Sequence, residues 1–296
     1  MNADKWIDKN APSLEGKVVA ITGATGGLGC VLCRYFAKLN AKIIMLNRSL
    51  EKSLALKNNL LAEFPSAEVE IIKLDLGVFQ DVLDVCSLLS NKQIDFLFIN
   101  AGIYNVPLTT GDTGYNNIFQ VNFVSPYYLV KNLLPTLRKY NAKVIAVGSI
   151  AHKYSQLNIN DVDFSRAKKA SKIYGNSKRF LMFSLYELFQ NEQSASLSVA
   201  HPGVTLTNMT NHYPKAINWL VKIGVKLLFP SPQKATLSLV AAMYDNCNYF
   251  EWIGPSRCNI WGKPKKTKLK IRNATESEQI FGIAEKIYDD LNNSAK

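Results

Sequence analysis

The sequence predicts an α/β domain built on a doubly wound parallel sheet with helices on both faces. Short apolar runs alternate with helix-like stretches between residues 17 and 203, which is the pattern of strands joined by crossover helices. The runs are almost continuously apolar, as strands covered on both faces must be. A glycine-rich turn follows the first run directly. These observations together favour one open sheet whose carboxyl edge binds a ligand.

The apolar runs predict six strands, and five helices are expected between them. The strands are Lys17–Thr22, Lys42–Leu46, Val69–Leu74, Ile94–Ile99, Lys143–Val147 and Leu197–Ala200. The helices lie near 27–39, 50–63, 78–91, 115–138 and 171–190. Since crossovers between parallel strands are right-handed, the carboxyl ends of the strands meet at one edge of the sheet.

The pattern changes beyond residue 203, but no linker separates the two parts, so we expect a single domain over 1–296. Its expected divisions are a core over 15–203, a lid and helix over 204–256, and a last strand and C-terminal helix over 257–296. The lid contains the apolar stretch Trp219–Phe229, a helix follows near 231–245, and the last strand is Cys258–Trp261. In the tail, Thr275-x-x-Glu278 predicts a capped helix.

The apolar runs and the cysteines of the sequence limit the classes of protein to which it can belong. No apolar run is long enough to span a membrane, and Met1–Gly16 does not read as a secretory leader, so we expect a cytoplasmic protein. Cys30 and Cys33 form a C-x-x-C inside an expected helix, and no cysteine has the spacing of a metal ligand. We therefore expect unpaired thiols and no metal.

The formal net charge of +12 includes a basic tract, Lys263–Lys270. Such a balance is typical of proteins that meet nucleic acid, an anionic membrane or an anionic cofactor. Aromatic residues do not interleave with this tract, as a stacking platform for bases requires. We therefore interpret the tract as a solvated loop and expect no nucleic-acid partner.

The turn after the first strand has the composition of a phosphate-binding loop. Glycines there permit a tight turn at Gly23, close approach of the backbone to a pyrophosphate at Gly27, and close helix packing at Gly29. The N-terminus of the following helix then faces the phosphates. A plain strand-to-helix turn is the alternative. The residues expected to bind are Gly23, Thr25, Gly26, Gly27 and Leu28.

Three other strand ends complete the expected dinucleotide site. Asp75 and Leu76 follow the third strand, where the carboxylate can accept a hydrogen bond from an adenine amino group or can simply cap a turn. Small residues after the fourth strand let the chain pass close to a ribose, and these are Asn100, Ala101 and Gly102.

The second strand ends in Asn47-Arg48-Ser49, without the acid that an NAD site uses for the ribose hydroxyls. The Arg48 guanidinium can instead bind a 2′-phosphate. We therefore predict NADP(H) rather than NAD as the cofactor.

Tyr174 and Lys178 lie four residues apart in an expected helix, so they project from one face. A nearby ammonium favours the phenolate, so we expect Lys178 to lower the pKa of Tyr174. Ser149 ends the fifth strand, where its hydroxyl can donate to a substrate carbonyl or cap a helix.

Asn122 precedes Pro126 by four residues, so its main-chain carbonyl loses its helical partner and can hold a water in a kinked helix. A mere proline kink is the alternative. The turn after the sixth strand can present backbone groups to a nicotinamide, and its residues are Pro202, Gly203, Val204 and Thr205. We interpret His201, which precedes them, as structural.

These motifs resemble the short-chain dehydrogenase/reductase family over nearly the whole chain. The matching segments are Thr22–Gly29, Asn100–Gly102, Asn122, Ser149, Tyr174-x-x-x-Lys178 and Pro202-Gly203. The resemblance implies a Rossmann-like fold, hydride transfer with NAD(P), and a catalytic tetrad of Asn122, Ser149, Tyr174 and Lys178. Ser149–His152 and Ile253–Lys265 are similar to the retinol-dehydrogenase-like and protochlorophyllide-reductase-like branch, whereas Ile99 and Asn47 depart from it.

The sequence thus predicts an NADP(H)-dependent oxidoreductase that interconverts a carbonyl and an alcohol on an apolar small molecule. Another reaction on the same scaffold, such as double-bond reduction or epimerisation, and a non-catalytic NADP-sensing protein remain as alternatives. The segment 215–229 suits a lid or a weak membrane contact. The sequence leaves open whether the protein forms a homo-oligomer.

Overall fold

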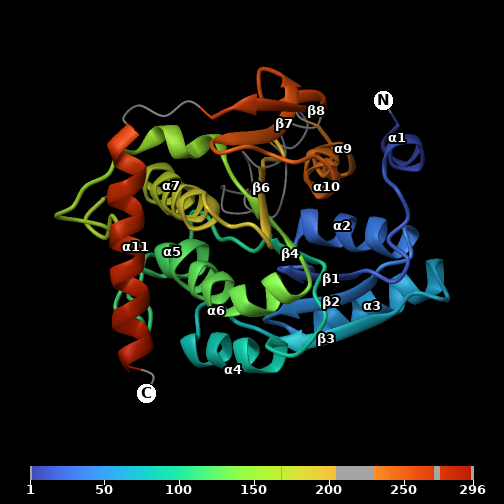
Figure 1. The fold of residues 1–296 in the computed structure, drawn as a ribbon, viewed down its shortest axis with the longest axis horizontal. Helices are drawn as coiled ribbons and strands as arrows, with labels where there is room; N and C mark the ends of the chain where they lie inside the picture. The colour runs from blue at the N-terminus through green and yellow to red at the C-terminus, as the bar shows by residue number, and fades with distance from the viewer. Residues whose placement is uncertain (1, 168, 205–229, 270–273, 295–296) are drawn as a thin grey trace, which may run out of the picture.

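The computed structural model describes residues 2–167, 169–204, 230–269 and 274–294. Its centre is one eight-stranded sheet in the order β3-β2-β1-β4-β5-β6-β7-β8, with helices packed on both faces (Figure 1). Every neighbouring pair is parallel except β7 Glu251–Arg257 and β8 Trp261–Lys268. The doubly wound α/β fold expected from the sequence is confirmed.

The six strands expected from the apolar runs all form, with ends shifted by at most two residues. They are β1 Val18–Thr22, β2 Lys42–Asn47, β3 Val69–Lys73, β4 Phe96–Ile99, β5 Lys143–Val147 and β6 Ser196–Ala200. β1 and β5 are buried at every position, because helices cover both of their faces.

Two layers of helices enclose two hydrophobic cores. One core lies beneath α4 Phe79–Leu89, α6 Ser125–Lys139, α7 Ala170–Phe189 and α11 Ala274–Ser294. The other lies beneath α1 Ala3–Asn10, α2 Gly27–Lys38, α3 Leu50–Glu63 and α10 Leu237–Tyr244. The short α5 Asn117–Phe119 precedes α6, and α9 Pro232–Ala235 precedes α10. The expected helix near 231–245 is therefore divided in two.

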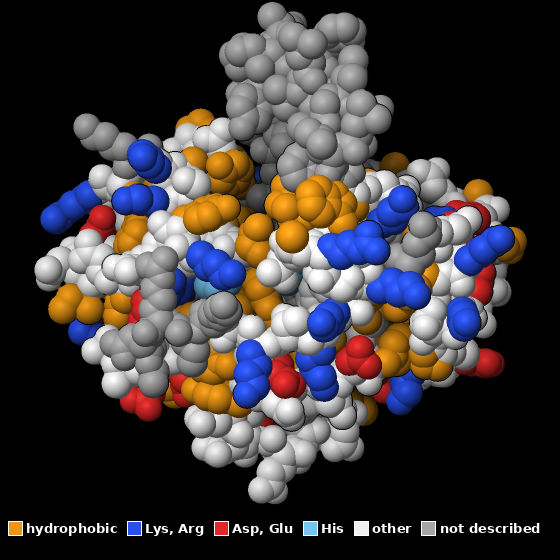
Figure 2. All heavy atoms as spheres, turned by 90° about the horizontal axis from the view of Figure 1, so that it is seen from above, with side chains coloured by type: hydrophobic (Ala, Val, Ile, Leu, Met, Phe, Trp, Pro, Cys, Tyr) orange, Lys and Arg blue, Asp and Glu red, His pale blue; other side chains and the backbone are white. Residues whose placement is uncertain are grey.

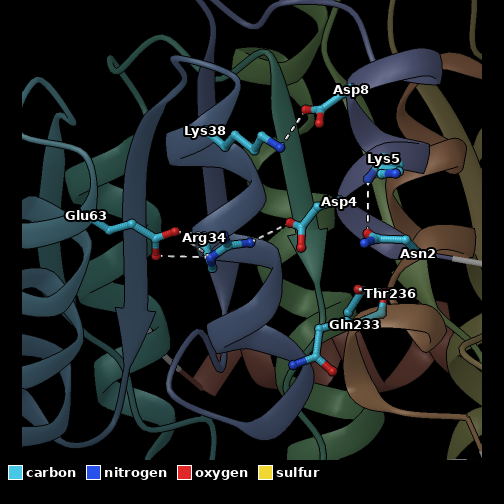
Figure 3. A network of polar contacts seen from close by, with 9 residues as sticks. All are labelled: Asn2, Asp4, Lys5, Asp8, Arg34, Lys38, Glu63, Gln233 and Thr236. Carbon is cyan, nitrogen blue, oxygen red and sulfur yellow. Dashed lines mark hydrogen bonds and ion pairs between the residues drawn. The ribbon is translucent and has the colours of Figure 1, made fainter.

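Helix α1 is absent from the sequence-based prediction, because its eight residues show only two buried positions, Ala3 and Ile7. Ion pairs secure it from outside the core (Figure 3). Arg34 of α2 lies 2.7 Å from Asp4 and 2.7 Å from Glu63 of α3, and Lys38 lies 2.5 Å from Asp8. These long-range pairs carry no periodic signal that a sequence would reveal.

The C-terminal strands correct two predictions. Cys258 and Asn259, placed in a last strand from sequence, have φ values of 53° and 55° and form the turn between β7 Glu251–Arg257 and β8 Trp261–Lys268. The hairpin therefore straddles the division expected between 256 and 257. Most of the basic tract expected as a loop is β8, the edge strand, where lysines discourage pairing with another sheet.

Thr275 lies inside the first turn of α11, which begins at Ala274, rather than at its N-cap as expected.

Segment 205–229, which holds the expected lid and the expected membrane contact, falls outside the described residues. None of the helices within the described ranges is long and apolar enough to cross a membrane. Basic side chains outnumber acidic ones on the face shown in Figure 2, in keeping with the net charge of +12.

His201 closes β6 against the hairpin. Its ring packs against that of Trp252, with 4.0 Å between the centroids and a tilt of 31°, and a Cβ at Gly254 would lie 1.9 Å from its Nε2. The Gly203 N–H donates to its Nδ1 at 3.2 Å. Burial lowers the pKa of His201 from 6.5 to about 4, so the imidazole is neutral in the folded protein.

This burial predicts an acid-sensitive fold. The unfolded chain binds a proton at His201 near pH 6.5 while the folded state does not until about pH 4, so the stabilising contribution is complete above pH 6.5 and is lost as the pH falls toward 4. Between pH 7.5 and 5 the free energy of unfolding should drop by about 2 kcal/mol from this group. Urea unfolding of wild type and His201→Asn measures it. An equal drop in both proteins would contradict the assignment.

Candidate active site

The turn after β1 requires glycine at two positions. Gly23 has a φ of +67°, and a Cβ there would lie 2.9 Å from the Ala101 Cα. A Cβ at Gly29 would lie 2.2 Å from the Gly23 carbonyl oxygen. Helix α2 then begins at Gly27, and no side chain caps it at Gly26. Its first N–H groups and its partial positive charge are therefore available to a phosphate.

Hydrogen bonds between the ends of β1 and β4 fix this turn. The Thr22 hydroxyl accepts the N–H groups of Asn100 and Ala101, both at 3.0 Å, and donates to Phe98 O. The Asn100 amide donates to Thr22 O at 2.9 Å and to Gly23 O at 3.1 Å. The sequence suggested Asn100 only as a small residue and did not predict these hydrogen bonds. They depend on the register between two strands whose bonded residues are 78 positions apart.

A groove of about 500 Å³ runs along the carboxyl ends of β1 to β4. It brings together the residues expected from these four strand ends to bind a dinucleotide. They are Gly23, Thr25, Gly26, Gly27, Leu28, Arg48, Asp75, Leu76, Asn100, Ala101 and Gly102. Lys52 also lines it. The turn 202–204 is not part of this lining, and Thr205 lies outside the described residues.

Asp75 takes the turn-capping role considered from sequence, whereas its expected contact with an adenine amino group stays a prediction. Its Oδ1 accepts the Gly77 N–H at 2.9 Å, as in a turn. Its Oδ2 lies 3.9 Å from Arg48 Nε at the groove. The Arg48 side chain is 78 % exposed, so the guanidinium can turn toward a phosphate without losing a buried partner.

The turn after β6 is held by the hairpin. Gly203 has a φ of +80°, and a Cβ there would lie 2.9 Å from Ile260 O, in the turn between β7 and β8. Pro202 and Val204 are half-buried beside it. This contact fixes the main chain just before the segment expected to form the lid.

Tyr174, Ser149 and Lys178 come together where α7 passes the end of β5. The Ser149 side chain hydrogen-bonds the half-buried Tyr174 phenol and also accepts the Ala151 N–H at 3.2 Å. It thus caps the 3-10 helix Ile150–Tyr154 as well. Lys178 is 2 % exposed, and its Nζ donates to Val147 O at 3.0 Å.

Asn122 joins three elements with one amide. Its Oδ1 accepts the Ile103 N–H at 2.8 Å, and its Nδ2 donates to Ile103 O at 2.9 Å and to Ser177 Oγ at 3.0 Å. It lies in a π-helical turn, Gln120–Val124, rather than in a simple proline kink. Such turns are frequent at functional sites.

The groove and the reactive side chains meet at Gly102. A Cβ there would lie 3.2 Å from Asn122 Oδ1 and 3.5 Å from Lys178 Nζ. Since Gly102 also lines the groove, a dinucleotide in the groove would come close to Asn122 and Lys178, two of the four residues expected to act in catalysis.

The pKa of Tyr174 moves in the direction opposite to the one expected from Lys178 alone. Burial raises the pKa of Tyr174 to about 12, although the Ser149 hydrogen bond lowers it, and the Tyr104 phenol raises it further. Burial also lowers the pKa of Lys178 to about 8. The Tyr104 ring lies edge-on to Tyr174 with 5.2 Å between centroids. Sequence reasoning missed Tyr104, which belongs to no motif.

The described residues hold no group of three or more His, Cys, Asp or Glu side chains arranged to bind a metal. Cys33 is buried in α2 and Cys30 half-buried, both as free thiols. Burial raises the pKa of both thiols, so neither has the character of a nucleophile.

The sheet, the glycine turn and the groove at its carboxyl edge define an open α/β protein of the dinucleotide-binding class. The short chain dehydrogenase family profile matches residues 17–218. This chain belongs to the short-chain dehydrogenase family, an oxidoreductase family.

Relatives support the branch expected from the motifs. An uncharacterized oxidoreductase of Schizosaccharomyces pombe is 29% identical over 259 residues, which cover 82% of this chain and 76% of the relative. Retinol dehydrogenase 12 of Mus musculus is 28% identical over 278 residues, covering 92% and 86%. The similarity to the retinol-dehydrogenase-like branch is confirmed.

Solved structures show the same fold. An uncharacterized protein from Mycobacterium Paratuberculosis superposes with a TM-score of 0.74 at 25% identity, covering 95% of this chain and 96% of that one. The NADP complex of RhlG from Pseudomonas aeruginosa gives a TM-score of 0.60 at 22% identity, covering 80% and 94%.

The contacts of Asn122 predict a large structural cost for its loss. Asn122→Leu keeps the volume but removes the partner of both the N–H and the C=O of the half-buried Ile103, so the free energy of unfolding should fall by about 3 kcal/mol. Asn91→Leu is the matched control, because the exposed Asn91 makes a long hydrogen bond, to Ser90 Oγ at 3.4 Å, and should cost less than about 1 kcal/mol. Urea unfolding measures both, and similar losses would contradict the role given to Asn122.

Proposed function

We propose that this protein is an NADP(H)-dependent oxidoreductase that interconverts a carbonyl and an alcohol. One observation carries the proposal. Gly102 lines the groove that suits a dinucleotide, and Lys178 and Asn122 lie against that residue. Tyr174 is one helical turn from Lys178 and hydrogen-bonded to Ser149. A hydride carrier and a proton donor would therefore meet at one place.

Each reactive side chain has a distinct part in this chemistry. When bound, NADPH supplies the hydride. Tyr174, whose pKa of about 12 keeps it protonated at neutral pH, donates its proton to the substrate oxygen. Ser149 donates a hydrogen bond as negative charge develops on that oxygen. Lys178, with a pKa of about 8, is matched to exchanging protons near neutral pH, and Asn122 holds the β4 loop against α7.

The preference for NADP(H) rests on Arg48. It lies at the groove beside Asp75 with an exposed side chain, and the end of β2 offers Asn47 where an NAD site has a carboxylate. Two solved neighbours of similar fold, RhlG and a metagenomic short-chain oxidoreductase, are complexes with NADP. The relatives named retinol dehydrogenase and polyprenol dehydrogenase support an alcohol or carbonyl substrate of apolar character.

Replacement of the proton donor tests the reaction. NADPH oxidation is screened across aldehydes, ketones and quinones, and Tyr174→Phe should lower turnover about 10²- to 10⁴-fold while NADPH affinity, measured by fluorescence titration, stays unchanged. Tyr140→Phe, at the opposite edge of the sheet after α6, is the control and should be fully active.

The outcomes separate the alternatives. Full turnover by Tyr174→Phe would indicate another reaction on this scaffold. NADPH binding without turnover of any carbonyl compound by the wild type would favour a non-catalytic sensor.

The cofactor preference has its own test. Arg48→Ala removes the cation proposed for the 2′-phosphate, so the dissociation constant for NADPH should rise about ten- to hundredfold while that for NADH barely changes. Lys57→Ala, a cation farther along α3, controls for general charge. Equal losses for the two cofactors would refute the preference for NADP(H).

A further inference from the structure

A buried ion pair connects the C-terminal helix to the helix that carries Tyr174 and Lys178. Arg179 follows Lys178 directly in α7, and its Nη1 lies 2.5 Å from Glu276 Oε2 in the first turn of α11. Arg179 is 2 % and Glu276 7 % exposed. Ion pairs removed from water are seldom more stabilising than apolar side chains of the same volume, so this pair calls for a role beyond stability.

Arg179 also holds the main chain that follows Ser149. Its Nε and Nη2 both donate to the His152 carbonyl, at 3.1 and 2.8 Å. His152 is tied back to Ser149, because its N–H donates to Ser149 O at 3.2 Å and its ring Nδ1 lies 2.7 Å from the same oxygen. The planar guanidinium therefore fixes the first turn after Ser149.

Glu276 holds the far end of the same segment. Its Oε1 accepts the Leu157 N–H at 3.1 Å, while its Oε2 binds Arg179. Segment 149–157 is thus attached at His152 and at Leu157 to one ion pair, whose members come from α7 and α11.

The segment lies directly against α7 at this point. A Cβ at Gly175 would lie 2.2 Å from Ala151 O, so no side chain of α7 sets the spacing there. Arg179 is four residues beyond Gly175 and shares its helix face. The Arg179 contacts therefore lie one helical turn from the closest approach between the helix that carries Tyr174 and the segment that carries Ser149.

We propose that Arg179 and Glu276 are a positioning pair that keeps the Ser149 hydroxyl at the Tyr174 phenol, so that α11 controls the reactivity of a site it does not touch. The inference rests on the proposed function, in which Tyr174 exchanges the proton. The Ser149 hydrogen bond lowers the pKa of Tyr174. Within the described residues, the other titratable side chains placed beside this phenol are Tyr104, from the loop after β4, and Lys178, one turn along α7.

Two conservative variants test the pair kinetically. Glu276→Gln keeps the shape and removes the charge, whereas Arg179→Lys keeps the charge and removes the planar donor pair on His152. In each, kcat for NADP⁺-dependent oxidation of the matching alcohol should fall about tenfold, with the KM for NADP⁺ unchanged. The rise of this rate with pH should move about one pH unit upward, since a displaced Ser149 no longer favours the phenolate.

Glu285→Gln is the matched control on the same helix. Glu285 accepts Lys131 Nζ of α6 at 2.7 Å, so it also secures α11 but makes no contact with segment 149–157. It should lower Tm without moving kcat or the pH profile. A pH shift in Glu285→Gln, or unchanged kcat and pH profile in both Glu276→Gln and Arg179→Lys, would overturn the proposal.

Hydrogen exchange gives a measurement that does not need turnover. Amides of 149–157 should exchange at least several times faster in Glu276→Gln and Arg179→Lys, and at the wild-type rate in Glu285→Gln. Wild-type protection in all three variants would overturn the proposal. If the wild type turns over no carbonyl compound, the proposed function fails on its own, and the exchange rates still decide whether the pair holds the Ser149 segment.

Discussion

Both halves of the site depend on the close approach of two turns, one after β1 and one after β4. Gly23 lies so near Ala101 that no side chain fits between them, and the Thr22 hydroxyl binds the chain where it leaves β4. Because this contact fixes the path of the β4 loop, it also fixes Gly102, against which Lys178 and Asn122 lie. The groove and the reactive side chains are therefore one arrangement, and neither can shift without the other.

Burial then sets the chemistry of that arrangement. Removing a phenol and an ammonium from water disfavours the charged form of each, which raises the pKa of Tyr174 to about 12 and lowers that of Lys178 to about 8. A protonated phenol is the form that donates a proton to a carbonyl oxygen. The reverse direction of the proposed reaction needs the phenolate, which positive charge near Tyr174 favours.

The fold, and the strand ends and helix at which the expected site residues lie, could be predicted from local patterns. Apolar runs, glycines and residues four apart in a helix can each be recognised within one short stretch of sequence. What escaped prediction depends on distant partners. Helix α1 is secured by Arg34 from α2, Asn100 acts through the strand register with Thr22, and Tyr104 matters only because its loop returns to Tyr174. The lysine-rich strand β8 was misread since its pairing with β7, and not its composition, makes it a strand.

Two neighbouring cations of α7 are equally buried but have different partners. Lys178 and Arg179 are each 2 % exposed. Arg179 has the Glu276 carboxylate at 2.5 Å, which compensates its charge. For Lys178 the described residues provide a hydrogen bond to the Val147 carbonyl but no ion pair. Burial, with no carboxylate beside the ammonium among these residues, lowers its pKa to about 8. A carboxylate beside Lys178 would favour its charged ammonium form and so oppose the loss of its proton. Because Glu276 pairs with Arg179 instead, it compensates the charge of Arg179 and leaves Lys178 able to exchange a proton.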